Sequence, residues 1–66
     1  MFDEIYINKK TGRRYFPMFD VINCTNANDG QKMIAYQVEK LEDGEEDLIF
    51  VREQKEFFEK FERAPS

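Results

Sequence analysis

Residues 23–31, NCTNANDGQ, bring together several residue types that can form a site. Asn23-Cys24-Thr25 matches the N-x-[ST] acceptor pattern for N-glycosylation. Glycan attachment requires secretion, and residues 1–4 (MFDE) have neither the basic nor the apolar segment of a signal peptide. The pattern therefore predicts a strand that ends in a polar loop, and not a glycan site.

The same run resembles a calcium-binding loop around Gly30. An EF-hand loop needs oxygen ligands at positions 1, 3 and 5, glycine at 6 and glutamate at 12. With Gly30 at position 6, Ala27 falls at position 3 and Tyr36 at position 12, where neither side chain can serve. Residues 28–30 (Asn-Asp-Gly) instead predict a chain reversal, because these residue types tolerate the left-handed conformation.

Nucleophilic and metal-dependent catalysis find no support in the composition. The 66 residues include one cysteine and no histidine, so neither a Cys–His pair nor a Cys/His zinc cluster can form. The default for Cys24 is a small buried thiol. The acidic residues gather in runs such as 45–47 and at helical spacing (Glu56, Glu59, Glu62), which is typical of solvated faces. We therefore expect a protein that is not an enzyme and has no cofactor and no metal.

A basic and aromatic stretch, KKTGRRY at residues 9–15, is the strongest candidate for binding. Its four cations can follow a phosphate backbone while Tyr15 stacks on a base. The alternative is a charged hairpin whose lysines discourage pairing at a sheet edge. The candidate partner-binding residues in and around this stretch are Tyr6, Lys10, Arg13, Arg14, Tyr15 and Phe16.

The net charge of −4 is unevenly distributed, because residues 1–38 sum to +1 and residues 39–66 to −5. Overall acidity argues against nonspecific nucleic-acid binding, which depends on neutralising phosphates. The acidic residues between 39 and 59 also allow a third possibility, in which they imitate the spacing of phosphates and occupy a nucleic-acid enzyme. Charge alone supports this acidic mimic.

The scaffold predicted by the hydrophobic pattern is mainly β. We expect strands at about 3–8, 13–24, 32–40 and 47–51, with glycine turns between them. The apolar LIFV segment (48–51) suits a buried strand, and Pro17 marks an edge, a bulge or a bend. The resulting fold is a small antiparallel barrel, or a strongly bent sheet, of four or five strands.

One C-terminal α-helix is expected at about 53–62. Phe57, Phe58 and Phe61 form a narrow apolar stripe that must dock on the sheet, because three turns of helix do not persist alone in water. Residues 1–66 then make a single small domain. The lone cysteine suits a reducing compartment and no apolar run reaches the roughly 18 residues of a membrane span. We expect a cytoplasmic protein that does not contact a membrane.

The order of these landmarks resembles the DUF1653 family of small bacterial and phage proteins of unknown function. The resemblance covers residues 5–62 and rests on Tyr6–Asn8, Lys10–Gly12, Tyr15, Met33–Tyr36, Phe50-Val51-Arg52 and Glu56–Phe61. The chain departs at Phe50, where the family often has tryptophan, and at Glu53, where it often has proline. The resemblance implies a small SH3-like β-barrel and brings no known activity and no catalytic residues.

The first functional hypothesis is a non-enzymatic module that binds another protein and, if phage-encoded, is directed at the host. Tyr6, Tyr15 and Phe16 beside the basic turn, facing the acidic loop at 42–47, would form its surface. The alternatives are a nucleic-acid binder that uses residues 9–15 and the acidic mimic. The partner's identity and the oligomeric state are left open by the sequence.

Overall fold

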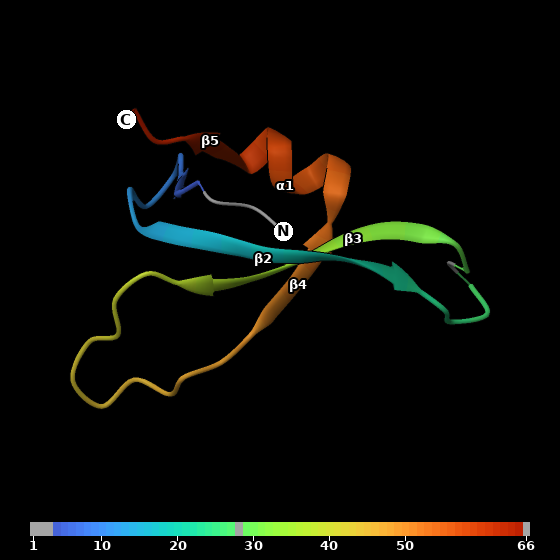
Figure 1. Ribbon diagram of the computed structural model, residues 1–66, viewed down its shortest axis with the longest axis horizontal. Coiled ribbons are helices and arrows are strands. Elements are labelled where there is room, and N and C mark those ends of the chain that lie inside the picture. The colour runs from blue at the N-terminus through green and yellow to red at the C-terminus, as the bar shows by residue number, and fades with distance from the viewer. Residues whose placement is uncertain (1–3, 28, 66) are drawn as a thin grey trace.

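The computed structural model describes residues 4–27 and 29–65, and it is built mainly from antiparallel strands (Figure 1). The elements in chain order are β1 (Tyr6–Asn8), β2 (Arg14–Asn23), β3 (Gln31–Val38), β4 (Phe50–Glu53), α1 (Gln54–Lys60) and β5 (Phe61–Arg63). The strands form one sheet in the order β4-β3-β2-β1-β5. The predicted class, mainly β with up to five antiparallel strands and one helix, is confirmed.

The sheet is open, with β4 and β5 as its two edges. In the described part of the chain these edge strands do not pair with each other, so the expected barrel is present only as an open sheet. The helix α1 directly follows β4 and directly precedes β5, so it connects the two edges of the sheet. The helix lies over the sheet between its two edges (Figure 1).

The end of the chain differs from the prediction. The helix stops at Lys60 and not at residue 62, because Phe61 adopts an extended conformation with φ −122° and ψ 148°. Residues 61–63 pair with β1, where Phe61 lies opposite Asn8 and Arg63 lies opposite Tyr6. This pairing satisfies the outer backbone groups of β1, which a longer helix would leave without partners. The helix is therefore not the last element.

The two longest strands, β2 and β3, form the hairpin that was predicted, within two residues at each end. The register shifts between Pro17 and Phe19, so Met18 is the extra residue of a bulge. Pro17 itself is buried opposite Tyr36. The expectation that Pro17 marks a bulge or bend is confirmed, and the bulge explains how an internal strand accommodates a residue without an N–H.

The core lies between α1 and one face of the sheet. Phe57 and Phe61 are 0% and 2% exposed, and their rings stack in parallel at 4.4 Å between centroids. They pack on Ile34 and Tyr36 of β3, with Tyr6 and Tyr15 around them. Phe58, the third member of the predicted stripe, is 43% exposed. Two of the three phenylalanines thus dock as predicted.

The LIFV segment is not the buried strand that its composition suggests. Only Phe50 and Val51 belong to β4, and all four residues from Leu48 to Val51 are between 41% and 54% exposed. Since β4 is an edge strand, its outer side has no neighbouring strand within the described ranges 4–27 and 29–65. The predicted strand at 47–51 is therefore right only at Phe50 and Val51, because β4 begins three residues later and continues to Glu53, and its apolar residues are exposed.

The loop between β2 and β3 is a turn, as expected. Gly30 has a positive φ of 87°, and its N–H donates to the carbonyl of Asn23 at 2.8 Å. The Asn23 side chain accepts the N–H of Thr25 at 2.9 Å. Asn28, a predicted turn residue, lies outside the described residues. Cys24 is exposed, so the expectation of a buried thiol is wrong, because β2 has already left the core at this point.

Replacing Phe57 by alanine is expected to lower the free energy of unfolding by about 3–5 kcal/mol, the usual cost of a buried phenylalanine. Small domains have about 5–15 kcal/mol in total, so much of the stability would be lost. Phe58→Ala is the matched control, since that ring is 43% exposed, and it should cost about 1 kcal/mol. Urea denaturation followed by circular dichroism measures both. Equal losses would contradict the assignment of Phe57 as the helix anchor.

Gly30→Val is expected to cost about 1–2 kcal/mol of unfolding free energy, because a branched residue is forced into the left-handed region. Apart from Gly30 and its two chain neighbours, no described residue has an atom within 4 Å of the position a Cβ would take, so the cost comes from the backbone conformation. Asn26→Val in the same turn, where φ is not positive, is the control. The same thermal unfolding temperature for both variants would refute this account.

Candidate functional site

An aromatic groove lies on the α1 side of the sheet, next to the helix. It consists of two adjoining pockets that share Tyr15 and Phe50. Further apolar lining comes from Val38 and Leu48 in one pocket and from Tyr36 and Phe61 in the other. Polar and charged side chains form the rims, and these are Arg13, Glu45, Glu46, Asn8 and Arg52.

Strand pairing places the rings of this groove in contact. Tyr15 lies opposite Val38 in the β2–β3 register, and Tyr36 lies opposite Phe50 in the β3–β4 register. The Tyr15 ring meets Tyr36 edge-on at 5.6 Å and Phe61 edge-on at 5.4 Å, and the Phe50 ring lies 5.7 Å from Tyr36. Edge-to-face contacts at these distances are favourable. The floor of the groove is therefore rigid, while Leu48 and Phe50 stay 47% and 41% exposed.

Arg52 fixes the end of the groove nearest α1. Its Nε donates to the hydroxyl oxygen of Tyr36 at 3.2 Å, and its Nη1 donates to Glu56 at 2.5 Å. The guanidinium carbon also lies 5.7 Å from the centre of the Phe61 ring. The bond to Tyr36 is the main cause that raises the pKa of Arg52, with Glu56 adding to it. These contacts orient the Tyr36 ring toward the groove.

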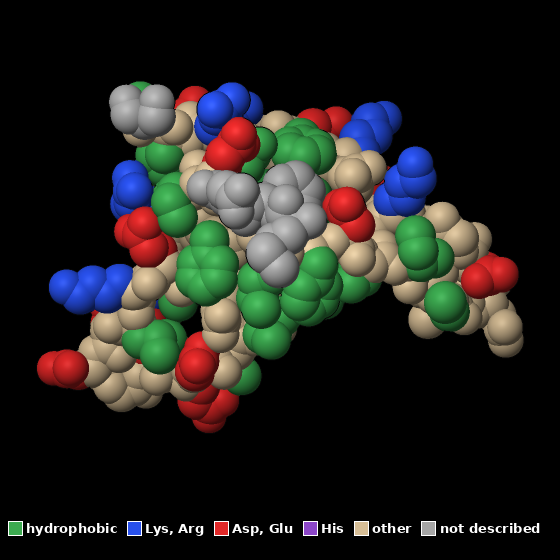
Figure 2. Space-filling view, in the orientation of Figure 1, with side chains coloured by type: hydrophobic (Ala, Val, Ile, Leu, Met, Phe, Trp, Pro, Cys, Tyr) green, Lys and Arg blue, Asp and Glu red, His purple; other side chains and the backbone are tan. Residues whose placement is uncertain are grey.

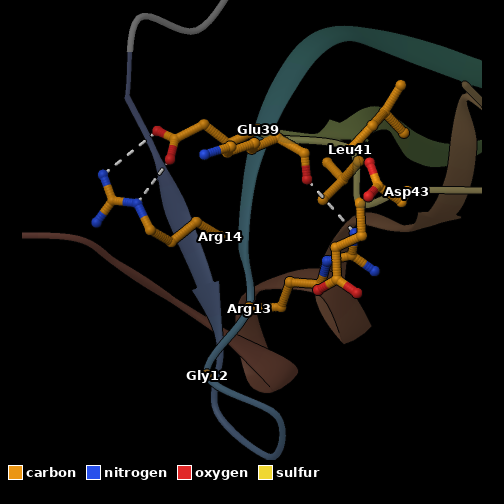
Figure 3. Close-up of a pocket in the computed structure, with 9 residues that line it drawn as sticks. Gly12, Arg13, Arg14, Glu39, Leu41 and Asp43 are labelled. Carbon is orange, nitrogen blue, oxygen red and sulfur yellow. Dashed lines mark hydrogen bonds and ion pairs between the residues drawn. The ribbon is translucent and has the colours of Figure 1, made fainter. Parts of the chain in front are cut away.

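Two bidentate ion pairs tie the end of the β1–β2 turn and the start of β2 to the loop at residues 39–49. Arg13 donates through both terminal nitrogens to the two carboxylate oxygens of Glu45, and Arg14 donates to Glu39 at 2.9 and 3.3 Å. Figure 3 shows Arg14 and Glu39 bordering an open depression of about 600 Å³ that Gly12, Leu41 and Asp43 also line. The ion pairs hold the loop beside the groove.

Hydrogen bonding shifts the acidity of Glu45. The side-chain bonds from Arg13 are the largest cause, and the backbone N–H of Glu42, which donates to Glu45 at 3.0 Å, is the second. Together they lower the pKa of Glu45 from 4.5 to about 2. The bonds between Arg14 and Glu39 likewise lower the pKa of Glu39. Both carboxylates are therefore fully ionised near neutral pH.

The structure separates the six predicted binding residues. Arg13 and Tyr15 both line the groove, as the hypothesis of a surface beside the acidic loop requires. Lys10 is exposed in the turn after β1 and lines neither pocket of the groove. The remaining three of the six lie elsewhere, and these are Tyr6, Arg14 and Phe16.

Tyr6 is half-buried and packs against the core, because its ring lies 5.4 Å from Phe57 and 5.9 Å from Phe58. Burial and the neighbouring carboxylate of Glu4 raise the pKa of its hydroxyl. Phe16 lies opposite Gln37 and so points to the face of the sheet away from α1. Tyr6, Tyr15 and Phe16 therefore do not form one surface.

Most of the groove was not predicted. Val38 joins it because β3 pairs with Tyr15 of β2, and Tyr36 and Phe50 join it because β3 pairs with β4. Leu48 lies in the loop that precedes β4. One usable signal existed, since the alternation in residues 32–40 already placed Tyr36 and Val38 on one face. No pattern in the sequence predicted that Leu48 and Phe50 would be exposed.

Comparison with protein-family models, with curated proteins and with solved structures finds no match to this chain. The resemblance to the DUF1653 family thus stays a prediction. Within residues 4–27 and 29–65, no three or more Cys, Asp or Glu side chains are grouped so that they could hold a metal ion. The described residues also include no helix with the length and apolar character needed to cross a membrane.

Arg13→Gln is expected to raise the pKa of Glu45 from about 2 toward its ordinary value of 4.5. In the wild type the ion pair stabilises the fold above pH 4.5, and this stabilisation is lost as the pH falls toward 2. The unfolding free energy of the wild type should therefore fall more steeply in this window than that of Arg13→Gln. A titration of the Glu45 carboxyl carbon by NMR measures the shift directly.

Lys10→Gln provides the control, because it removes a cation from the same turn without touching Glu45. Its Glu45 titration should match that of the wild type. If Arg13→Gln also leaves the titration unchanged, the ion pair does not hold the loop in solution.

Proposed function

We propose that this chain is a non-enzymatic binding module whose aromatic groove receives a short apolar segment of another protein. The observation that supports it is the exposure of Leu48 and Phe50, at 47% and 41%, over the packed rings of Tyr15 and Tyr36. Exposed apolar groups that gather in a hollow and are bordered by charged residues are characteristic of protein interaction sites.

The rigidity of the floor favours binding. Tyr36 is held by the hydrogen bond from Arg52, and Tyr15 is held between Tyr36 and Phe61. A partner that inserts an apolar side chain therefore gains contact area without having to immobilise these rings. Aromatic anchors of this kind commonly supply most of the binding energy at an interface.

Charge around the groove favours a cationic partner. The loop at residues 42–47 contains five acidic residues, and Arg13 neutralises one of them, Glu45. Glu46 lines the groove directly. A lysine or arginine next to the apolar anchor of the partner would meet this field. The proposed ligand is therefore an apolar segment with an adjacent basic residue.

The two alternatives have less support. Two of the four cations at residues 9–15, Arg13 and Arg14, already bind carboxylates through two bonds each, and a phosphate would have to displace them. The same two ion pairs neutralise Glu39 and Glu45, which leaves fewer free carboxylates to imitate phosphates in the acidic-mimic hypothesis. The proposal includes a cytoplasmic location, which the lone cysteine supports. It also includes a phage-encoded protein directed at its host, which the DUF1653 resemblance supports.

Selection from a displayed library of random peptides tests the proposal. The wild type should enrich peptides that carry an apolar residue beside a lysine or arginine. Phe50→Ser and Leu48→Ser should each weaken binding of these peptides by about tenfold or more, the effect of losing a central anchor. Ile22→Ser is the matched control, because Ile22 is 56% exposed but lies outside the groove, and it should bind normally.

Failure to enrich any peptide would refute the groove as a protein-binding site, and so would equal binding by the wild type and Phe50→Ser. A parallel titration with a single-stranded oligonucleotide separates the alternative. Binding there that weakens steeply with salt and is lost in a Lys9→Gln, Lys10→Gln variant would favour the nucleic-acid hypothesis.

A further inference from the structure

A hollow beside the last turn of α1 collects basic side chains. Its volume is about 380 Å³, and residues of β1, of the turn after β1, of β4 and of α1 line it. The lining consists of Asn8, Lys9, Lys10, Arg52, Glu59 and Lys60. Four of these six residues are cations, although the whole chain has a net charge of −4. We call this hollow the lysine pocket.

Backbone pairing brings two of the lysines together from distant parts of the chain. The β1–β5 ladder has Asn8 opposite Phe61. One residue further along, the N–H of Lys9 donates to the carbonyl of Lys60 at 3.0 Å. Like charges that lie opposite each other on paired chains destabilise the fold. The pairing therefore carries an electrostatic cost, which an anion bound in the pocket would remove.

The lysines of the pocket form no ion pair with any described carboxylate. All four arginines of the chain, in contrast, pair with a glutamate. Glu56 precedes Lys60 by four residues, a spacing that allows a pair on a helix, but it binds Arg52 at 2.5 Å instead. Figure 2 shows acidic and basic side chains interspersed on one face of the molecule. A group of cations without such partners is thus unusual for this chain.

The charge of the pocket matches a doubly charged anion. Arg52 and Glu56 neutralise each other, and the three lysines together with Glu59 leave a sum of +2. A phosphate monoester has a charge of about −1.5 to −2 at neutral pH. A carboxylate and a phosphate diester of nucleic acid each have a single negative charge. The balance therefore favours the monoester, and lysine is a common ligand for phosphate.

Asn8 adds an uncharged donor to the pocket. Its Oδ1 accepts the N–H groups of Lys10 and Thr11 at 2.9 and 3.1 Å, which fixes the side chain. Its Nδ2 donates to no other residue in the described ranges and is available for a phosphate oxygen. Asn8 and Arg52 also line the aromatic groove, so the two sites adjoin. A phosphate in the lysine pocket would have its organic substituent next to the rings of the groove.

We infer that the lysine pocket binds a phosphate monoester through the ammonium groups of Lys9, Lys10 and Lys60 and the side-chain amide of Asn8. The organic substituent of the ester is apolar or aromatic, because it meets Tyr15 and Phe50 of the adjoining groove. None of the three lysines lines the groove, so the inference does not depend on the proposed function. A phosphorylated side chain of a protein and a free small molecule both supply this group, and the experiment separates them.

An NMR titration of the complete isotope-labelled chain with phenyl phosphate, at constant ionic strength, tests the inference. The amide signals of Asn8, Lys9 and Lys60 should shift and reach saturation. Methyl phenyl phosphate, the singly charged diester with the same ring, should bind about fivefold more weakly or worse, the effect of losing one charge interaction at an exposed site. Lys9→Gln and Lys60→Gln should each weaken phenyl phosphate binding by a similar factor.

Lys55→Gln is the matched control, because it removes an exposed lysine of the same helix that does not line the pocket. Its affinity for phenyl phosphate should stay within about twofold of the wild type, since a distant exposed charge is screened by salt. Equal losses in Lys55→Gln and Lys60→Gln would show a response to net charge alone and would overturn the inference. It is also overturned if the three amide signals do not shift to saturation, or if the diester binds as well as the monoester.

A second titration identifies the source of the phosphate group. A short peptide that contains phosphotyrosine should bind about tenfold more tightly than phenyl phosphate if the group belongs to a protein, because the flanking residues add contacts. Equal affinity assigns the pocket to a free small molecule. Both results require the pocket to bind phosphate, and neither depends on which peptides the displayed library enriches.

Discussion

The parallel stack of Phe57 on Phe61, at 4.4 Å, is the contact on which the rest of the structure depends. A helix of seven residues cannot form alone in water, so α1 exists because these rings have Ile34 and Tyr36 to pack against. The same stack joins the two edges of the sheet, since α1 begins where β4 ends and leads into β5. This pair of side chains therefore links the packing of the core to the connection between the two edge strands.

The apolar exposure on both faces of the sheet follows from the small size of this helix. A helix of two turns covers only part of one face, and the uncovered remainder of that face is the aromatic groove. The opposite face receives no helix, although Phe19 and Val51 make it apolar. A longer helix or a second one would have buried these residues within the chain. Limited coverage is thus what leaves apolar surface available to other molecules.

The parts of the fold that depend on local patterns were predicted well. A long extended run predicted β2, and alternation predicted β3, each within two residues. The missing N–H of Pro17 predicted an edge, a bulge or a bend, and the structure has the bulge. The parts that depend on distant pairing were missed, including β5, because Phe61 fits a helical stripe until β1 pairs with it. The sequence could have predicted that Tyr15 and Phe16 lie on opposite faces of the sheet, since successive side chains of a strand point to opposite faces.

The pairing of β1 with β5 has a consequence for the order in which the protein folds during synthesis. Asn8 and Phe61 are direct partners although 53 positions separate them, so one edge of β1 must wait until nearly all of the described chain has been made. The β2–β3 hairpin, by contrast, can close as soon as its own turn has been translated. The hairpin is thus the natural nucleus, and the growing chain carries exposed apolar strands until residues 61–63 arrive.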